Sequence, residues 1–375
     1  MDGRPEQGNG SGSMGRIVKA LPPDRFAVHG TNAEMRWDAM RGAGLLVPND
    51  RFFVRDHTRT PLIDARTWRL RLFGDGLRGA PTRARAVEFG YADLLAMPSR
   101  TLDAVIECAG NGRALFASQQ DTPMPGIPWG LGGIGAARWR GVPLAAVLER
   151  AGLRADAVDV LASGLDPDFV LDGENLGRVR RPLPVGKALD DVLIAYEMNG
   201  VPLPPDHGFP ARLVVPGWVG IASIKWLGEI EVARRPLPSP WTTRMYRMSG
   251  PGHPPGGGPA LTEQVAKSAF ELAWDERVPL GRPVVLTGRS WSPRGPVHGV
   301  EVSVDGGASW RPARLRDGDT AWSRWSLEWC PDRTGPVVLA ARAVDATGAR
   351  QPVRSEPNDD GYLFAAAVHH RVQVT

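Results

Sequence analysis

The chain has 375 residues, which is enough for two domains that each bury a hydrophobic core. Its apolar fraction of 42% is ordinary for a globular protein, and no run reaches the roughly 18 apolar residues that a membrane-spanning helix needs. A net charge of +4, without a basic run interleaved with aromatic residues, argues against nucleic-acid binding. We therefore expect neither a nucleic-acid partner nor a membrane partner. Cys108 and Cys330 are too few and too distant for a disulfide framework or a zinc site.

The N-terminal segment, MDGRPEQGNGSGSMG, is polar and rich in Gly and Ser. We predict an N-terminal arm over residues 1–40 that is partly disordered. The segment has neither the apolar core of a secretory signal nor a twin-arginine start. As the sequence stands we expect a cytoplasmic protein, and a periplasmic location would follow if an export signal had been removed.

Residues 41–245 mix helical and strand patterns, which predicts one mixed α and β domain. A short helix is expected over 91–97, and a clearer one begins at Pro143, where apolar residues follow at helical spacing. Residues 118–136 are so rich in Pro and Gly that we predict irregular structure there, which is commonly functional. Strands are predicted at 68–74, 101–107, 158–162, 191–197, 212–215 and 229–233.

The C-terminal third has a different texture. Residues 246–262 contain the stretch SGPGHPPGGGP, which predicts a linker. Residues 263–375 alternate apolar and polar positions, with turn signals at DGG and DATG, and Val300, Val302 and Val304 fall on one face. This pattern predicts a β-sandwich.

The stretch 101–113, TLDAVIECAGNGR, is the first candidate for a functional site. Cys108 lies at the exit of a predicted buried strand, and the Ala-Gly-Asn-Gly that follows allows a sharp turn and a close approach to a ligand. Arg113 adds a permanent positive charge near the sulfur. A buried structural cysteine is the plain alternative. The glycines and the arginine favour the functional interpretation.

The second candidate is the stretch 206–226, DHGFPARLVVPGWVGIASIKW. It brings His207, Arg212 and Lys225 into an apolar segment interrupted by Gly and Pro, in a chain with only four lysines. Cations in such a setting suit the phosphate of an anionic cofactor. The alternative is a solvated His and Arg that flank one strand.

The two stretches, ECAGNGR and DHGFPxRxVVPGxxGxxxxKWL, resemble the sulfite oxidase family and occur in the family's order. The resemblance extends from about residue 40 to the C-terminus. It implies an α+β protein, in which a mixed α/β molybdopterin domain precedes an all-β, immunoglobulin-like domain that forms a homodimer. It also implies a molybdenum–molybdopterin cofactor with Cys108 as the metal ligand. We expect no haem, because the sequence contains no Cys-x-x-Cys-His.

The resemblance also implies which residues bind the cofactor. Arg55 and His57 belong to FVRDH, which resembles the family's FxRNH segment with Asp56 in place of Asn. Asp166 in SGLDPD matches the family's cofactor-contacting Asp, with Asp168 as the alternative if the alignment is displaced. Taken alone, these would be ordinary loop and turn residues. The full expected set is Phe53, Arg55, His57, Cys108, Asp166, His207, Arg212, Ser223 and Lys225.

The implied catalytic residues are Cys108, Arg55, Arg113, Tyr246 and Trp129. By this resemblance, Arg55 and Arg113 orient a small anionic substrate. Tyr246, in SPWTTRMYR, resembles the tyrosine whose hydroxyl faces the metal's oxo group. Trp129 resembles the tryptophan that walls the substrate pocket, and a hydrophobic anchor is the alternative interpretation.

One segment departs from the family. Its Asn-x-Arg-Gly segment, whose Arg helps to bind the anion, is replaced by Asn358-Asp359-Asp360-Gly361. A carboxylate at Asp360 repels a dianion rather than attracting it. The substrate is therefore less well defined by the sequence than the cofactor.

We hypothesise a molybdenum-dependent oxidoreductase that transfers an oxygen atom, oxidising sulfite to sulfate. The electrons would pass to a separate acceptor, a cytochrome or another molecule, because the chain has no cytochrome sequence of its own. One alternative is a reductase of an oxo-substrate, nitrate or a sulfoxide, with the same cofactor. The other is a binding module without a cofactor.

Overall fold

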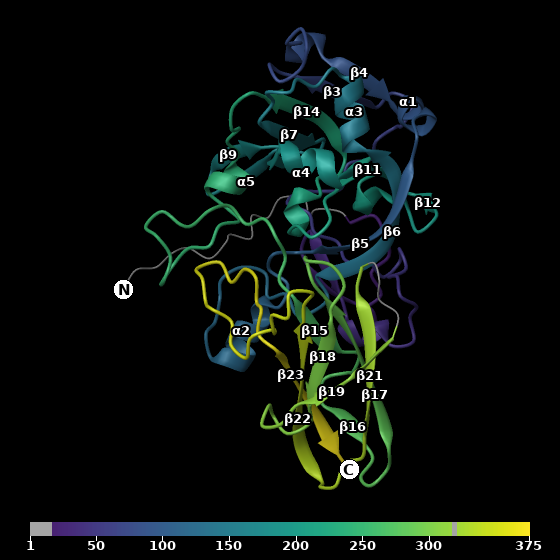
Figure 1. Ribbon diagram of the computed structural model, residues 1–375, viewed down its shortest axis with the longest axis vertical. Coiled ribbons are helices and arrows are strands. Elements are labelled where there is room, and N and C mark those ends of the chain that lie inside the picture. The colour runs from purple at the N-terminus through teal and green to yellow at the C-terminus, as the bar shows by residue number, and fades with distance from the viewer. Residues whose placement is uncertain (1–16, 317–320) are drawn as a thin grey trace.

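The computed structural model describes residues 17–316 and 321–375 (Figure 1). The chain forms a mixed α/β domain, in the upper half of Figure 1, and an all-β domain below it, which ends at the C-terminus. The predicted fold class is therefore confirmed. The first sixteen residues of the predicted N-terminal arm lie outside the described residues.

Two sheets form the mixed domain. The first has the order β10 (Arg180–Pro184), β7 (Asp159–Gly164), β14 (Leu227–Ala233), β3 (Arg69–Phe73) and β4 (Val87–Gly90). The second has the order β12 (Val201–Pro202), β11 (Leu193–Met198), β6 (Ile134–Pro143) and β5 (Arg100–Glu107), and β13 (Arg212–Val214) pairs with β11. Small strand pairs are β1 (Phe26–His29) with β2 (Asn32–Met35) and β8 (Phe169–Leu171) with β9 (Glu174–Gly177).

The helices of this domain are short. The α-helices are α1 (Tyr91–Ala96), α2 (Arg113–Gln120), α3 (Leu144–Arg150), α4 (Val185–Asp190) and α5 (Pro240–Thr243). The 3₁₀ helices are η1 (Trp37–Met40), η2 (Arg83–Arg85), η3 (Pro205–His207) and η4 (Gly220–Ala222). Over the described residues, no helix has both the length and the apolar character to cross a bilayer.

The predicted helices correspond to α1 and α3, and each predicted strand overlaps a strand of the structure. The prediction of irregular structure over 118–136 was wrong at both ends, where α2 and β6 extend into it. Two glycines interrupt the strand pattern of β6 because the neighbours of β6 leave no room for a side chain there. A Cβ added at Gly135 would lie 2.5 Å from the Phe52 ring, and one at Gly141 would lie 2.0 Å from the Ile194 carbonyl oxygen. Close packing here overrides the local propensity.

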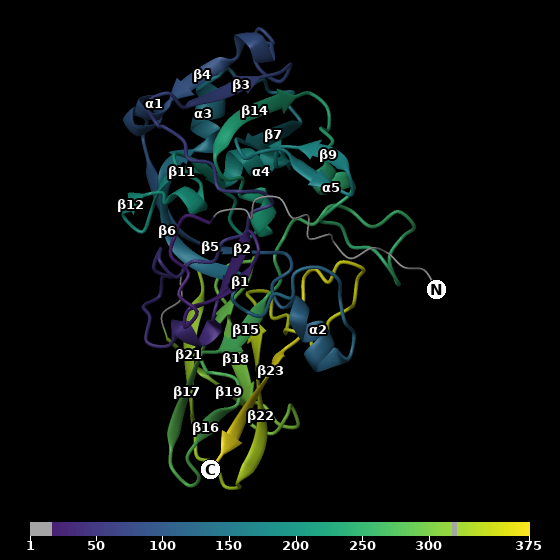
Figure 2. The same cartoon turned by 180° about the vertical axis from the view of Figure 1, so that it is seen from behind.

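The C-terminal domain is a sandwich of two sheets, seen from both sides in Figures 1 and 2. One has the order β15 (Lys267–Phe270), β17 (Val284–Trp291), β21 (Ser323–Trp329) and β20 (Arg314–Arg316). The other has the order β16 (Glu276–Val278), β23 (Val368–Val374), β22 (Gly335–Val344), β18 (Gly299–Ser303) and β19 (Arg311–Pro312). Phe270, Val302, Trp325 and Leu339 are buried between the sheets, as the alternation predicts.

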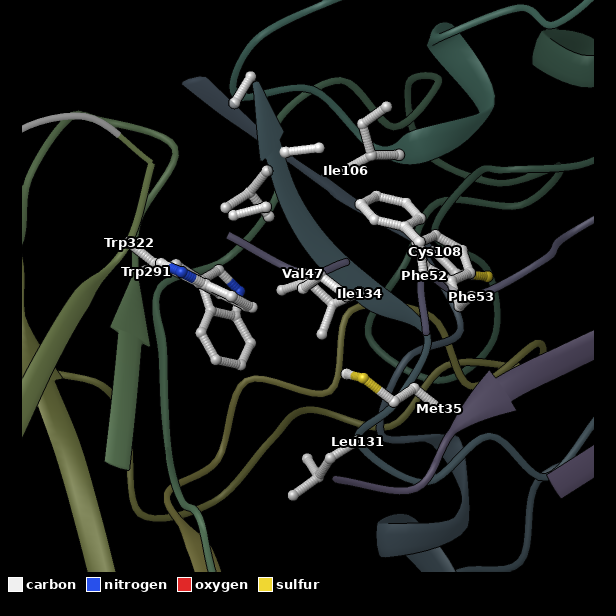
Figure 3. Close-up of a cluster of buried hydrophobic side chains, with 14 of the residues drawn as sticks. Met35, Val47, Phe52, Phe53, Ile106, Cys108, Leu131, Ile134, Trp291 and Trp322 are labelled. Carbon is white, nitrogen blue, oxygen red and sulfur yellow. The ribbon is translucent and has the colours of Figure 1, made fainter. Parts of the chain in front are cut away.

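The two domains share one hydrophobic cluster. Phe52 and Ile134 of the first domain and Trp291 and Trp322 of the second belong to it (Figure 3). Trp37, within the segment predicted as an N-terminal arm, joins the same cluster and donates a hydrogen bond of 2.8 Å to the carbonyl oxygen of Phe270. The sandwich is therefore packed against the mixed domain rather than merely linked to it.

Candidate active site

A single pocket of the mixed domain gathers most of the residues that the sequence singles out. Its lining includes Phe53, Arg55, His57, Cys108, Asp166, His207, Arg212, Ser223, Lys225 and Tyr246. These residues come from separate segments of the chain, and the fold brings them together at the end of β5 and beside β13 and η4.

Cys108 follows the last residue of β5 and is buried. Its amide donates to the Gly133 carbonyl oxygen at 2.8 Å, which continues the pairing of β5 with β6, and its own carbonyl oxygen accepts from the Asn111 amide at 2.9 Å. Figure 3 shows the sulfur beside Phe52 and Phe53. The turn therefore holds the thiol at a fixed place in the pocket wall.

His207 ends η3 and is buried, and its Nε2 has no hydrogen-bond partner among the described residues. Burial, with the nearby charges of Lys19, Lys225 and Arg212, holds the imidazole pKa well below its usual value, so the ring is neutral. Gly208 follows with a φ of 108°, where a Cβ would lie 2.9 Å from the Cβ of Arg212. A neutral imidazole with an open polar atom is ready to bind a polar group of a ligand.

Arg212, at the start of β13, is a buried cation. Its guanidinium donates to the carbonyl oxygens of Leu213, His207 and Ser223 at 3.2, 3.0 and 3.0 Å. Burial lowers its pKa to about 9, which still leaves it charged at neutral pH. In the described part of the chain these hydrogen bonds go to carbonyls, so the positive charge is available to an anion.

Lys225 and Asp56 form a buried ion pair beside this arginine. The ammonium contacts the Asp56 carboxylate and donates to the Asp206 carbonyl oxygen at 2.6 Å. Burial lowers the pKa of Lys225 and raises the pKa of Asp56, in spite of their attraction. Asp56, where the family has Asn, therefore offsets much of the charge that Lys225 brings to the pocket.

The choice between the two predicted aspartates is clear from their positions. Asp166 is buried in the pocket wall, where it accepts a hydrogen bond of 3.2 Å from the Val179 amide, and burial raises its pKa to about 6. Asp168 is exposed and accepts from the Asn175 side chain at 3.0 Å. Asp166, rather than the alternative Asp168, therefore places a carboxyl group in the pocket.

A second group of lining residues surrounds Tyr246, and we call it the Tyr246 end of the pocket; here several donors converge on one ring nitrogen. His57 Nε2 lies 3.1 Å from an Arg55 guanidinium nitrogen, 3.3 Å from the Tyr246 hydroxyl and 3.3 Å from Trp241 Nε1. Burial, together with Arg55 and Lys225, holds the His57 pKa well below its usual value. Trp241 Nε1 can only donate, so His57 Nε2 is the acceptor and the Tyr246 hydroxyl is a donor in this arrangement. Burial is also the main reason that the pKa of Tyr246 is raised.

Two predicted catalytic residues lie outside the lining of this pocket. Arg113 begins α2 and donates to the carbonyl oxygens of Asp360 and Ile127 at 2.8 and 2.9 Å. Trp129 is buried behind Phe53, with ring centroids 6.3 Å apart. Their roles in substrate binding stay predictions.

Arg113 is nevertheless connected to the pocket. Its guanidinium lies over the Tyr362 ring at 5.6 Å, and that ring stacks on Tyr246 at 5.3 Å. Burial, Tyr246 and Asp360 all raise the pKa of Tyr362, so the partly exposed Asp360 carboxylate lies near Tyr362. The departure from the family motif therefore lies close to the Tyr246 end of the pocket.

Two residues that support Tyr246 were not predicted from the sequence. Arg181 on β10 is buried, contacts the carbonyl oxygens of Trp241 and Leu261, and lies 5.9 Å from the Tyr246 ring. Trp241 on α5 is fully buried and donates to His57. Arg181 gives no local signal because its partners are distant in sequence, whereas Trp241 could have been found from its nearness to Tyr246 in the chain.

The residues present fit a molybdopterin cofactor. The open Nε2 of His207 and the guanidinium of Arg212 are positioned for polar and anionic groups, and Cys108 offers the soft thiolate that molybdenum prefers. Close backbone approach also needs small residues, and a Cβ at Gly220 would lie 2.8 Å from the Glu107 carbonyl oxygen. The pocket thus combines a metal ligand with a cradle for an organic anion.

Comparison with known families supports this interpretation. Residues 57–241 match the oxidoreductase molybdopterin binding domain, and residues 264–375 match the Mo-co oxidoreductase dimerisation domain. The fold and the site therefore define a protein of the molybdopterin oxidoreductase class. The dimerisation domain supports a homodimer.

Relatives and a solved structure define the family. The chain is 34% identical to mitochondrial sulfite oxidase of Mus musculus over 88% of this chain and 62% of that protein. It is 35% identical to sulfite oxidase of Gallus gallus over 82% of this chain and 68% of that protein. The crystal structure of the sulfane dehydrogenase SoxCD from Paracoccus pantotrophus superimposes with a TM-score of 0.78 at 26% identity, over 99% of this chain and 97% of that one.

The chain belongs to the sulfite oxidase family of molybdopterin oxidoreductases. It spans 62% of the length of the mouse relative.

Proposed function

We propose that this enzyme oxidises sulfite to sulfate by transferring an oxygen atom, and that its electrons pass to a separate acceptor. The observation that carries the proposal is the shared pocket of Cys108, the Tyr246–His57–Arg55 group and the cationic cradle of His207, Arg212 and Lys225. The names of the mouse and chicken relatives agree with this substrate.

We assign the residues as follows. Cys108 ligates molybdenum, and Arg212 and Lys225 bind the anionic part of the pterin while His207 Nε2 bonds one of its polar groups. The bound cofactor supplies the oxygen-atom transfer and accepts two electrons. Phe53, Asp166 and Ser223 complete the cofactor wall.

At the other end of the pocket, Arg55 orients the anionic substrate. Its guanidinium is buried, and although burial opposes the charge, the nearby Tyr246, Cys108 and Asp56 raise its pKa, so it stays a cation. The Tyr246 hydroxyl donates to His57 in the structure and is free to turn to a substrate or product oxygen. The neutral His57 holds both donors in place.

A second candidate substrate is a sulfur compound of lower charge. Asp360 stands where the family has an anion-binding Arg, and its carboxylate lies near Tyr362 at this end of the pocket. A carboxylate there disfavours a dianion. The structural neighbour of similar length is named a sulfane dehydrogenase, which fits a sulfane sulfur in place of free sulfite.

A sulfite-dependent ferricyanide assay on protein from a cofactor-competent host tests the proposal. We expect ferricyanide reduction that saturates with sulfite. With reduced viologen as the electron donor, we expect slower oxidation of the viologen by nitrate or by a sulfoxide. Reduction of nitrate or a sulfoxide that exceeds sulfite oxidation would contradict the proposal. Faster ferricyanide reduction with a sulfane-sulfur compound would favour the second candidate.

A further inference from the structure

Glu107, the residue immediately before Cys108, is a buried carboxylate that does not face the pocket. It is 3% exposed and its two oxygens accept three hydrogen bonds. Asn111 Nδ2 and Lys267 Nζ donate to Oε1 at 2.9 and 2.6 Å, and Trp291 Nε1 donates to Oε2 at 2.9 Å. Every bond is of ordinary or short length, so the carboxylate is fully held.

The same network reaches the far side of the turn that carries the thiol. Lys267 Nζ also donates to the main-chain oxygen of Asn111 at 3.0 Å. The Asn111 side-chain oxygen accepts from the Gly133 amide at 2.9 Å, and the Gly133 carbonyl oxygen accepts from the Cys108 amide at 2.8 Å. One ammonium group therefore bridges the residue before Cys108 and the residue three positions after it.

The donors Lys267 and Trp291 come from the C-terminal sandwich, not from the domain that holds the pocket. Lys267 begins β15 and Trp291 ends β17, and the two residues are opposite each other in the antiparallel pairing of these strands. Both side chains are almost completely buried. The edge of the sandwich thus presents a matched pair of donors to the end of β5.

A buried ion pair seldom stabilises a fold more than a well-packed apolar pair would, because both charges lose their hydration. Lys267 and Glu107 are both at most 4% exposed as side chains. What a fully bonded buried network does provide is a unique geometry. Because the network lies next to Cys108 in the chain, the geometry that it fixes is that of the turn carrying the thiol.

We propose that Lys267 and Trp291 are positioning residues for the molybdenum site, through which the C-terminal domain fixes the Cys108 turn. They act on the metal through Glu107 and Asn111 and do not touch it. This inference rests on the proposed role of Cys108 as the metal ligand. It gives the C-terminal domain a part in the metal site of its own protomer, in addition to dimerisation.

The sharpest test compares two tryptophans of the same cluster. Trp291 and Trp322 lie side by side in Figure 3 with ring centroids 6.3 Å apart, and both are buried. Each donates from Nε1 into the mixed domain, Trp291 to Glu107 and Trp322 to the carbonyl oxygen of Leu45 at 2.5 Å. Trp291→Phe and Trp322→Phe remove one such bond each and keep most of the ring volume.

The measurement uses the full-length enzyme loaded with cofactor. The rate of molybdenum loss during dialysis is followed by elemental analysis, and the electron paramagnetic resonance spectrum of the reduced metal is recorded. We expect Trp291→Phe to lose molybdenum several-fold faster and to show an altered spectrum. Trp322→Phe should match the wild type in both, at a similar melting temperature.

A larger effect is expected at the ion pair. Lys267→Met should accelerate molybdenum loss by about 10–100-fold, the usual range for residues that orient a metal ligand. The matched control is Arg289→Met, because Arg289 is also buried in the sandwich, pairs with Glu271 and donates to main-chain oxygens at residues 43–45. If Lys267→Met does not fold, the comparison of Trp291→Phe with Trp322→Phe still tests the inference.

Equal molybdenum loss within each pair of variants, or an unchanged spectrum for Trp291→Phe, would overturn the inference. Such results would leave the proposed function standing, because wild-type enzyme would still hold the metal. Wild-type protein without molybdenum would overturn the proposed site and this inference together. Loss of sulfite oxidation alone, with these metal readouts as expected, would concern only the substrate.

Discussion

The polar side chains at the two ends of the pocket differ in how far their hydrogen bonds are already satisfied within the protein. At the cradle end, His207 has an open nitrogen and Arg212 a positive charge held by carbonyls. At the Tyr246 end, Arg55, Trp241 and the tyrosine hydroxyl converge on one nitrogen of His57. The cradle end is prepared for an anion, whereas the Tyr246 end is already satisfied internally and is bordered by Asp360.

This difference separates what is common to the family from what is particular to this chain. By the motif resemblance, the cradle agrees with the family at every residue that the sequence singles out except Asp56. The same resemblance implies a larger change at the Tyr246 end, where Asp360 takes the place of an anion-binding Arg. We infer that cofactor binding is retained and that substrate preference is where this enzyme can differ from its relatives.

The largest expected effect is at the sulfur that both ends share. Cys108→Ser should lower turnover by about a thousandfold or more, because an alcohol is a poor ligand for a metal that prefers thiolate. Turnover and molybdenum content are measured on the same preparation. Cys330→Ser is the control, because Cys330 is exposed and outside the pocket. Wild-type turnover in the Cys108 variant would remove the sulfur from the mechanism.

The next effect concerns the buried acid of the cradle end. The pKa of Asp166 is about 6 in the folded chain against 3.8 for the ordinary group, so the folded state binds more protons between these values. The contribution of Asp166 to stability is therefore fully present below about pH 4 and is lost as the pH rises through about 6. Relative to Asp166→Asn, the free energy of unfolding of the metal-free chain should fall by about 2 kcal/mol from pH 4 to pH 7, most of the about 3 kcal/mol that the whole pKa shift represents. A difference that stays constant over this range, in denaturant titrations, would refute the assignment.

A pair of buried arginines distinguishes the two ends directly. Arg212→Met removes the cradle cation, and a charged hydrogen bond of about 1.5–3 kcal/mol predicts about 10–100-fold weaker retention of molybdopterin. Arg181→Met removes a guanidinium that also contacts carbonyls but lies behind Tyr246. We expect it to keep the cofactor and to lower kcat. Pterin fluorescence measures how much cofactor each variant retains. Equal loss of cofactor in Arg212→Met and Arg181→Met would contradict the proposed difference between the two ends of the pocket.

The smallest expected effect is at Asp360, near the Tyr246 end of the pocket. Asp360→Arg should lower the KM for sulfite by about tenfold, or about 1.4 kcal/mol, because it replaces repulsion by attraction. Asp359→Arg is the control, because that neighbouring acid is exposed and its change adds the same charge. Steady-state assays with both variants that gave the same KM would show that Asp360 does not act on the anion.

Much of the cofactor end could be predicted from the sequence because its residues lie in two compact motifs. Cys108 at a strand exit and the His207–Lys225 stretch each carry a local signal, and the family resemblance joins them. Arg181 and Glu107 could not be assigned, because the partners of Arg181, and the Lys267 and Trp291 partners of Glu107, lie 60 or more positions away in the sequence. The strand β6 escaped prediction for a related reason, since its glycines reflect contacts with Phe52 and Ile194 rather than local propensity.

We infer that the pocket lined by Cys108 holds a molybdopterin-bound metal. Elemental analysis of purified full-length protein from a cofactor-competent host tests it most directly. We expect about one molybdenum atom per chain in the wild type and almost none in Cys108→Ser with its fold intact. Wild-type protein that is folded and free of molybdenum under those conditions would contradict it.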